Sequence, residues 1–230
     1  MGAVLAEQAL VRICDLAGRA RGTGFVADGT GTVITSHEAV DGLVRVVVHA
    51  PGERSHLAES DAITRLPEWD LALIRTEGLG VAPLLIGAER PAAGSTSVRL
   101  FTGGGESDVP EGAAAVPRQQ EWGWTEARLA GRATTVTYTS TDRFHDLEGA
   151  RELTLPEAAA ARLRLNGPAS GTPVLDTATG AVLAVLGTAL HAPGAGKRSA
   201  FAVPLRTAGL WDLEGQLAAV LARTRAERAA

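Results

Sequence analysis

The chain has 230 residues, 45% of them hydrophobic, which is enough apolar material for one large domain or two small ones with a common core. Its formal net charge of −4 argues against nonspecific nucleic-acid binding, which requires a basic face. With 27 glycines and 4% aromatic residues, the composition favours a β-rich fold with small core side chains.

Short apolar runs fill the first part of the chain. They are rich in Val, Ile, Leu and Thr, and turn residues such as Gly, Pro and Asp separate them. Short strands at this spacing are typical of a barrel or a sandwich. The expected strands cover residues 10–16, 22–27, 32–35, 43–49, 57–66 and 71–74.

The pattern continues through a strand at 97–101 and is then interrupted. Residues 103–121 are rich in Gly, Ala, Pro and Glu, which predicts an irregular connection between two halves. Residues 156–161 favour one or two helical turns, and residues 208–230 carry apolar residues at helical spacing. The remaining expected strands cover residues 122–130, 133–139, 174–176, 181–187 and 200–205.

The single cysteine, Cys14, lies in an apolar run, so we expect a buried thiol with no disulfide inside the chain. This fits a reducing compartment. The sequence lacks a recognisable signal peptide and any apolar run of transmembrane length. The five histidines show no metal-ligand spacing. We therefore expect a cytoplasmic protein without membrane contact, metal or other cofactor.

The stretch 166–174 places Ser170 in a tight turn of Gly and Pro residues, directly before an apolar strand. A hydroxyl held in such a turn can be presented to a substrate beside main-chain N–H groups. Attack on a carbonyl further requires a base, a group that orients the base, and N–H donors for the developing oxyanion.

Five motifs follow one another along the chain. They are Gly22-Thr23-Gly24-Phe25-Val26, Val33-Ile34-Thr35-Ser36, Asp70-Leu71-Ala72-Leu73-Ile74, Ser170-Gly171-Thr172-Pro173-Val174 and Ala200-Phe201-Ala202-Val203-Pro204. This ordered set resembles the trypsin-like (chymotrypsin-fold) serine peptidases, within their bacterial intracellular and HtrA-like branch. The resemblance covers about residues 10–207, and it implies an all-β fold of two six-stranded antiparallel β-barrels with the active site between them.

With this resemblance, the chain divides into four predicted parts. These are a first β-barrel at 10–102, a connecting loop at 103–121, a second β-barrel at 122–207 and a C-terminal α-helix at 208–230. The chain order of the catalytic residues in the family is His, Asp, Ser.

The resemblance assigns the orienting carboxylate to Asp70 and the nucleophile to Ser170. Gly171 follows the serine as in the family, whereas Ala169 replaces the usual Asp or Asn. Pro168 replaces a glycine whose N–H forms half of the family's oxyanion hole, and proline has no N–H. Loss of one such donor costs on the order of 100–1000-fold in rate.

The base is the open question. Counting from Thr35, the family's histidine position is Glu38, and His37 lies one residue earlier. A local shift of this turn would bring His37 into the site as general base. Alternatively, Glu38 lies in the site as a carboxylate beside Asp70, and two close carboxylates would share a proton and serve poorly as a base at neutral pH.

Two further residues are candidates for the substrate cleft. Arg164 lies a few residues before the serine, in the region that partly sets the primary specificity pocket of the family. His191 follows the strand at the position where the family's second barrel lines the cleft. The alternative for both is an ordinary surface residue.

Two functions remain open. The first is a degenerate peptidase (a pseudopeptidase) that recognises or regulates a peptide or protein, because Glu38, Pro168 and Ala169 depart from the family at the catalytic machinery. The second is an active bacterial intracellular serine endopeptidase with Ser170 as nucleophile, His37 as base and Asp70 as orienter. In either case the C-terminal helix is expected to pack on the barrel or to lead to further domains or a partner.

Overall fold

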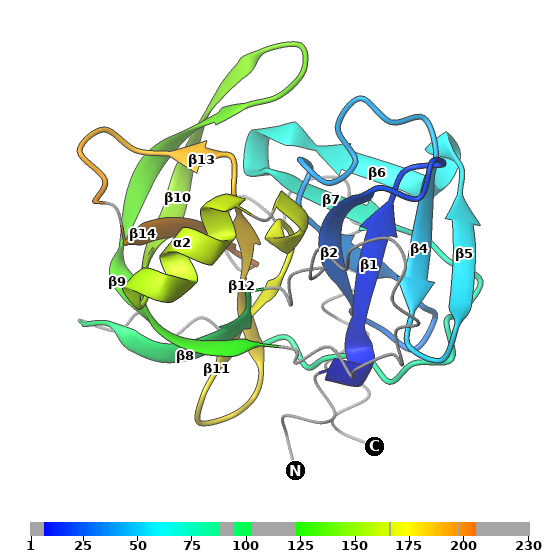
Figure 1. Ribbon diagram of the computed structural model, residues 1–230, viewed down its shortest axis with the longest axis horizontal. Helices are drawn as coiled ribbons and strands as arrows, with labels where there is room; N and C mark the ends of the chain where they lie inside the picture. Colours follow the sequence, from blue (N-terminus) through cyan, green and yellow to red (C-terminus); the bar gives the residue numbers. More distant parts are fainter. Residues whose placement is uncertain (1–6, 88–93, 103–122, 166, 197, 206–230) are drawn as a thin grey trace, which may run out of the picture.

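The computed structural model describes residues 7–87, 94–102, 123–165, 167–196 and 198–205. These residues form two antiparallel β-sheets that lie side by side, the first in blue and cyan and the second in green to orange (Figure 1). The mostly β, two-sheet architecture expected from the sequence is thereby confirmed. The predicted C-terminal helix at 208–230 lies outside the described residues.

The first sheet contains seven strands in the order β5-β4-β1-β2-β3-β7-β6. Six were expected. The difference arises because the 3₁₀ turn η1 (Ser60–Ala62) interrupts the expected strand 57–66 and divides it into β5 and β6. These two edge strands are consecutive in the chain, so the sheet curls back toward itself. The bounds are β1 (Leu10–Cys14), β2 (Ala20–Val26), β3 (Val33–Thr35), β4 (Val46–Ala50), β5 (Arg54–Ala58), β6 (Ile63–Leu66) and β7 (Leu71–Ile74).

The second sheet also contains seven strands where six were expected, in the order β10-β14-β12-β11-β8-β9-β13. An additional pairing between β9 and β10 closes it into a ring. The expected strands at 122–130 and 133–139 form the single strand β9, and β10 covers residues where no strand was expected. β13 is a two-residue segment that pairs with the far end of β9. The bounds are β8 (Thr96–Phe101), β9 (Trp124–Thr139), β10 (Phe144–Thr154), β11 (Pro173–Asp176), β12 (Val182–Gly187), β13 (Leu190–His191) and β14 (Ser199–Pro204).

The chain passes between the two sheets earlier than the sequence predicts. β8 was expected to end the first barrel, but it pairs with β9 and β11 in the second sheet. Composition alone misses this, because strand pairing is a long-range property. The crossing therefore lies between Ile74 and Thr96.

Each sheet has its own apolar core, and a third cluster lies between the two sheets. Val48 and Ile74 belong to the core of the first sheet. Helix α2 (Glu157–Leu165) contributes Leu163 to the core of the second sheet. The third cluster joins Phe25 of β2 to Phe201 of β14, so the two sheets pack directly on each other.

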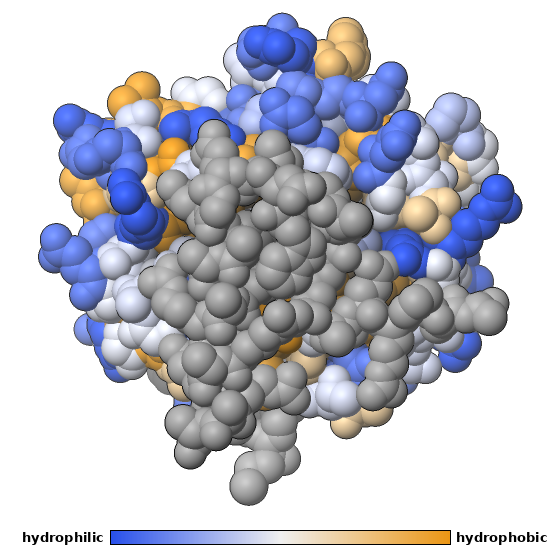
Figure 2. Space-filling model, turned by 180° about the vertical axis from the view of Figure 1, so that it is seen from behind, coloured by the Kyte–Doolittle hydropathy of each residue, from blue (hydrophilic) through white to orange (hydrophobic). Residues whose placement is uncertain are grey.

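The surface of the described residues is mixed in character. Hydrophilic side chains lie around much of the margin of the face opposite to that in Figure 1 (Figure 2). Within the described part of the chain, no helix is long and apolar enough to cross a membrane.

Candidate active site

Ser170 follows the 3₁₀ turn η3 (Gly167–Ala169) and directly precedes β11. Gly171 has a left-handed backbone with φ of 86°, a conformation that L side chains rarely adopt. A Cβ at this position would lie 2.0 Å from the carbonyl oxygen of Thr23, so only glycine fits. The turn is therefore shaped by a close approach of the two sheets.

Strand β2 holds the serine turn in place. The Thr23 N–H donates to the Ser170 carbonyl at 2.7 Å, and the Thr23 hydroxyl donates to the Pro168 carbonyl at 2.8 Å. A Cβ on Gly22 would lie 2.8 Å from the Ser170 carbonyl oxygen. The Gly22-Thr23-Gly24 motif thus packs against the serine turn and hydrogen-bonds to it.

Strand pairing brings Glu38 to Asp70. Thr35 at the end of β3 pairs with Ala72 near the start of β7, so the residues after Thr35 lie beside the residue that precedes β7. That residue is Asp70, and its Oδ1 accepts the main-chain N–H of Glu38 at 3.0 Å.

The β11–β12 pairing places Ser170 and Thr188 around the same carboxylate. Pro173 of β11 pairs with Val185 of β12, and the hydroxyls of Ser170 and Thr188 both hydrogen-bond to Glu38. Two further main-chain bonds extend the ladder toward the serine, from Leu186 to Thr172 at 2.9 Å and from Gly171 to Leu186 at 2.8 Å.

The carboxylate of Glu38 lies between these elements. Its Oε2 accepts the Ser170 hydroxyl at 2.6 Å and the Ala189 N–H at 3.1 Å. The Thr188 hydroxyl lies 2.9 Å from Oε1 and 2.8 Å from Oε2. A side chain of the first sheet is thus bound by three donors of the second.

Ser36 forms a further part of this network that sequence reasoning missed. Its Oγ lies 2.6 Å from the Oγ of Ser170, and both side chains are buried. A hydroxyl has a single proton, and that of Ser170 is donated to Glu38. Ser36 therefore donates to Ser170, and this bond uses a lone pair of the candidate nucleophile.

Asp70 is 1% exposed, and its backbone is left-handed with φ of 45°. Burial, reinforced by the negative charge of Glu38 and opposed by the Glu38 N–H, raises the pKa of the Asp70 carboxyl well above its usual range. Among the described residues, Oδ2 has no hydrogen-bond partner. A Cβ on Gly187 would lie 2.5 Å from this oxygen, so a larger residue does not fit there.

His37 is directed elsewhere. Its Nδ1 lies 2.7 Å from the hydroxyl of Tyr138 on β9, and both side chains are buried. The Tyr138 ring stacks on His145 with 5.8 Å between ring centroids. Burial lowers the pKa of His37, which favours the neutral imidazole. The structure thus brings Ser170, Glu38 and Asp70 together and joins His37 to the β9–β10 ribbon.

The oxyanion donors differ from those that the family resemblance implies. Pro168 has no N–H to donate. The N–H of Gly171 is donated to the carbonyl of Leu186.

The two predicted cleft residues lie on different elements. His191 is exposed on β13, which follows Ala189 directly, and it pairs with Thr137 of β9. Arg164 lies in α2, but its side chain falls outside the described residues. In the described part of the chain, no cluster of three or more His, Cys, Asp or Glu residues could hold a metal ion.

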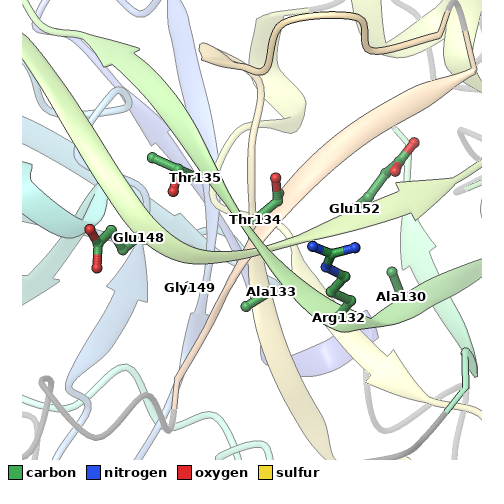
Figure 3. Close-up of a pocket in the computed structure, with 8 residues that line it drawn as sticks. All are labelled: Ala130, Arg132, Ala133, Thr134, Thr135, Glu148, Gly149 and Glu152. Atoms are coloured by element: carbon green, nitrogen blue, oxygen red, sulfur yellow. The ribbon is translucent and has the colours of Figure 1, made fainter.

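A hollow of about 580 Å³ lies on the paired strands β9 and β10 (Figure 3). The register of the ribbon shifts between Leu147 and Ala150, and Gly149 has φ of 89°. The walls combine Arg132 with Glu148 and Glu152. This open, mixed-charge hollow shares no residue with the Ser170–Glu38 network, and we assign it no role in chemistry.

A family model described as a trypsin-like peptidase domain matches residues 22–185, which is more than half of the chain. The chain therefore belongs to the trypsin-like peptidase domain family. A comparison with curated proteins finds no match.

Solved structures give the same fold for this trypsin-like domain. The active form of the Rv3671c protease from M. tuberculosis has a TM-score of 0.65 at 22% identity, with 95% of this chain and 83% of that chain covered. The HtrA-type protease AlgW with a tripeptide has a TM-score of 0.58 at 16% identity, covering 88% and 58%. A serine endoprotease from Yersinia pestis has a TM-score of 0.58 at 14% identity, covering 88% and 61%. Likeness at these identities shows the fold alone.

Proposed function

We propose that this trypsin-like domain does not hydrolyse peptide bonds through Ser170 and instead uses its fold to recognise a peptide or protein. One observation carries the proposal. The Ser170 hydroxyl donates to the carboxylate of Glu38 at 2.6 Å, while the imidazole of His37 is bound to Tyr138. The group beside the serine is therefore a carboxylate.

A carboxylate is a poor general base for a serine near neutral pH. The ordinary pKa values of glutamate and histidine are about 4.3 and 6.5, and efficient proton transfer requires a base whose pKa lies near the working pH. Proton abstraction from Ser170 is accordingly disfavoured.

The state of the serine supports the same proposal. Ser170 is fully buried, and the bond from Ser36 uses one of its lone pairs. The absence of an N–H at Pro168 removes a donor that would stabilise an oxyanion. Three separate requirements of acyl transfer are thus weakened at one place.

If Ser170 does not hydrolyse peptide bonds, the domain can still bind a peptide or protein. AlgW, an HtrA-type protease of the same fold, has been solved with a tripeptide. We extend peptide or protein recognition to this chain as part of the proposal, with the cytoplasm as its location.

The alternative is an active serine endopeptidase with Ser170, His37 and Asp70. The adjacency of His37 and Glu38 in one turn keeps this alternative open, because a change of that turn exchanges the two side chains. Such an exchange would break the His37–Tyr138 bond and the donor contacts of Glu38.

Incubation with a proteome-derived peptide library tests the proposal. The wild-type protein and the Ser170→Ala variant are each used to enrich peptides, and mass spectrometry identifies the bound and cleaved species. We expect neither protein to generate new peptide termini, because the proposed function is recognition without hydrolysis. New peptide termini that arise with the wild type and not with Ser170→Ala would overturn the proposal.

A further inference from the structure

The three donors around the Glu38 carboxylate all belong to the second half of the chain. Ser170 precedes β11, whereas Thr188 and Ala189 lie between β12 and β13. Glu38 comes from the turn after β3 in the first sheet. One half of the molecule thus provides a complete set of carboxylate donors, and the other half provides the carboxylate.

We propose that Ser170, Thr188 and Ala189 form a binding site for a carboxylate, which Glu38 occupies as an internal ligand. An acidic group of a peptide, either an Asp or Glu side chain or a C-terminal carboxylate, binds there when the Glu38 side chain moves out. This inference rests on the proposed function, because it names the ligand class that a non-hydrolytic site recognises.

The donor geometry is that of a built anion site. Two hydroxyls and one main-chain N–H converge on a single carboxylate at 2.6 Å, 2.8 Å and 3.1 Å. Hydrogen bonds to an ionised acceptor are about twice as strong as neutral ones. Because all three donors are uncharged, the site favours a singly charged carboxylate over a doubly charged anion.

The site does not depend on Glu38 for its shape. Its two sides are held by the β11–β12 pairing and by the bonds from Leu186 to Thr172 and from Gly171 to Leu186. Thr23 holds the Ser170 carbonyl from β2. These contacts are all main-chain bonds, so they persist when the Glu38 carboxylate leaves.

Glu38 can release its carboxylate without unfolding the turn. Its main chain is anchored separately, through the N–H that donates to Asp70 at 3.0 Å. The residue is half-buried, as are Thr188 and Ala189, so the side chain has a route to solvent. Rotation of the Glu38 side chain therefore frees the three donors without moving the main chain of the turn.

The first test uses the Glu38→Ala variant and acetate as the probe. At 100 mM acetate, we expect the thermal midpoint of the variant to rise by about 3–6 °C relative to sodium chloride of equal ionic strength, as for a ligand with Kd of about 10 mM. Acetamide, which is uncharged, and the wild-type protein should show no such rise. Adding Thr188→Val to the variant should abolish it.

The Glu38→Gln variant replaces Glu38→Ala in the acetate test if Glu38→Ala does not fold. It retains the side-chain shape with a neutral amide, against which acetate competes more readily than against a carboxylate. We expect acetate to bind this variant at least about tenfold more tightly than it binds the wild type, measured by NMR titration. Equal affinities, or an acetate effect that Thr188→Val does not change, would overturn the proposal.

Short peptides distinguish the two sources of the carboxylate. Acetyl-tetraalanine with a free C-terminus carries only a terminal carboxylate, and its amidated form with one internal Glu carries only a side-chain carboxylate. Binding of either one, and not of amidated acetyl-tetraalanine, supports the site. Failure of acetate and both peptides would contradict this inference and leave the absence of hydrolysis untouched, whereas cleavage dependent on Ser170 would overturn the proposed function itself.

Discussion

The hydroxyl of Ser170 donates a 2.6 Å hydrogen bond to Oε2 of Glu38. Glu38 follows β3, and Ser170 precedes β11, so this bond joins the two sheets at their contact. In a serine peptidase, the group at this place takes the proton of the nucleophile. Here the group is a carboxylate that accepts hydrogen bonds from three donors of the second half of the chain.

Replacement of Glu38 by alanine should destabilise the fold. It leaves the Thr188 hydroxyl and the Ala189 N–H without their acceptor in a half-buried place, which costs about 1–3 kcal/mol. Urea denaturation of the wild type and the variant measures this difference in the free energy of unfolding.

Glu59→Ala is the matched control for this loss. Glu59 also accepts a short bond, from Arg45 at 2.7 Å, but both side chains are about half exposed. An exposed ion pair contributes about 0–1 kcal/mol, so the control should change little. An equal loss of unfolding free energy in both variants would show that the hydrogen bonds of Glu38 stabilise the fold no more than an exposed ion pair does.

Ionisation of Asp70 should cost stability as the pH rises. Its pKa in the folded protein is raised above the ordinary value of 3.8, mainly by burial, so the folded state holds the proton more tightly than the unfolded chain does. The associated stability is fully present below pH 3.8 and is lost as the pH rises through the folded pKa.

The Asp70→Asn variant isolates this effect, because asparagine cannot ionise. The variant should have the same stability as the wild type near pH 4, and its relative stability should increase toward neutral pH. Urea midpoints measured between pH 4 and pH 8 test the difference. A constant difference across this range would show that Asp70 does not carry the raised pKa.

The positions of Asp70 and Ser170 could be read from the sequence because each lies in a local motif next to an apolar strand. Counting from Thr35 likewise identified Glu38 as the residue at the histidine position. Each motif adjoins a strand, and the pairing of that strand determines which residues lie beside the motif. The Thr35–Ala72 pairing, for example, places Glu38 next to Asp70.

The partners of these residues could not be predicted in the same way. Thr188 and Ser170 meet at the Glu38 carboxylate from separate segments of the chain, and Tyr138 reaches His37 from a strand far along the chain. Neither Thr188 nor Tyr138 lies in a motif. The membership of β8 in the second sheet was missed for the same reason, because long-range pairing leaves no local pattern.

Tyr138→Phe should weaken the contact between the turn after β3 and the β9–β10 ribbon. The change keeps the ring that stacks on His145 and removes the hydroxyl that pairs with Nδ1 of buried His37. The unpaired nitrogen should cost about 1–3 kcal/mol in urea denaturation.

Ser55→Ala is the control, since it removes a hydroxyl that lies 2.7 Å from Nδ1 of His49 at an exposed place. A surface change of this kind should remain within about 0.5 kcal/mol. If Tyr138→Phe costs no more than Ser55→Ala, the His37–Tyr138 bond does not stabilise the fold.

Gly171→Ala should be among the most damaging single changes in the chain. It adds a Cβ 2.0 Å from the Thr23 carbonyl oxygen, at a backbone φ of 86°. Overpacking and left-handed strain together predict a loss of about 3 kcal/mol or more.

Gly180→Ala separates the two causes. Gly180 has φ of 72°, but no heavy atom lies within 4 Å of the place that a Cβ would take. Strain alone therefore applies, and the loss should be about 1 kcal/mol. Similar losses of stability for the two variants would mean that the backbone near Gly171 and Thr23 shifts at little cost to accommodate the added Cβ.

Labelling with a fluorophosphonate probe tests directly whether Ser170 is an activated nucleophile. The folded wild-type protein, the Ser170→Ala variant and trypsin as a positive control are incubated with the probe at neutral pH, and mass spectrometry locates any adduct. We predict that trypsin is labelled and that the wild-type protein is no more labelled than Ser170→Ala. An adduct on Ser170 that forms in the wild-type protein would contradict the assignment of Glu38 as a bound, non-catalytic carboxylate.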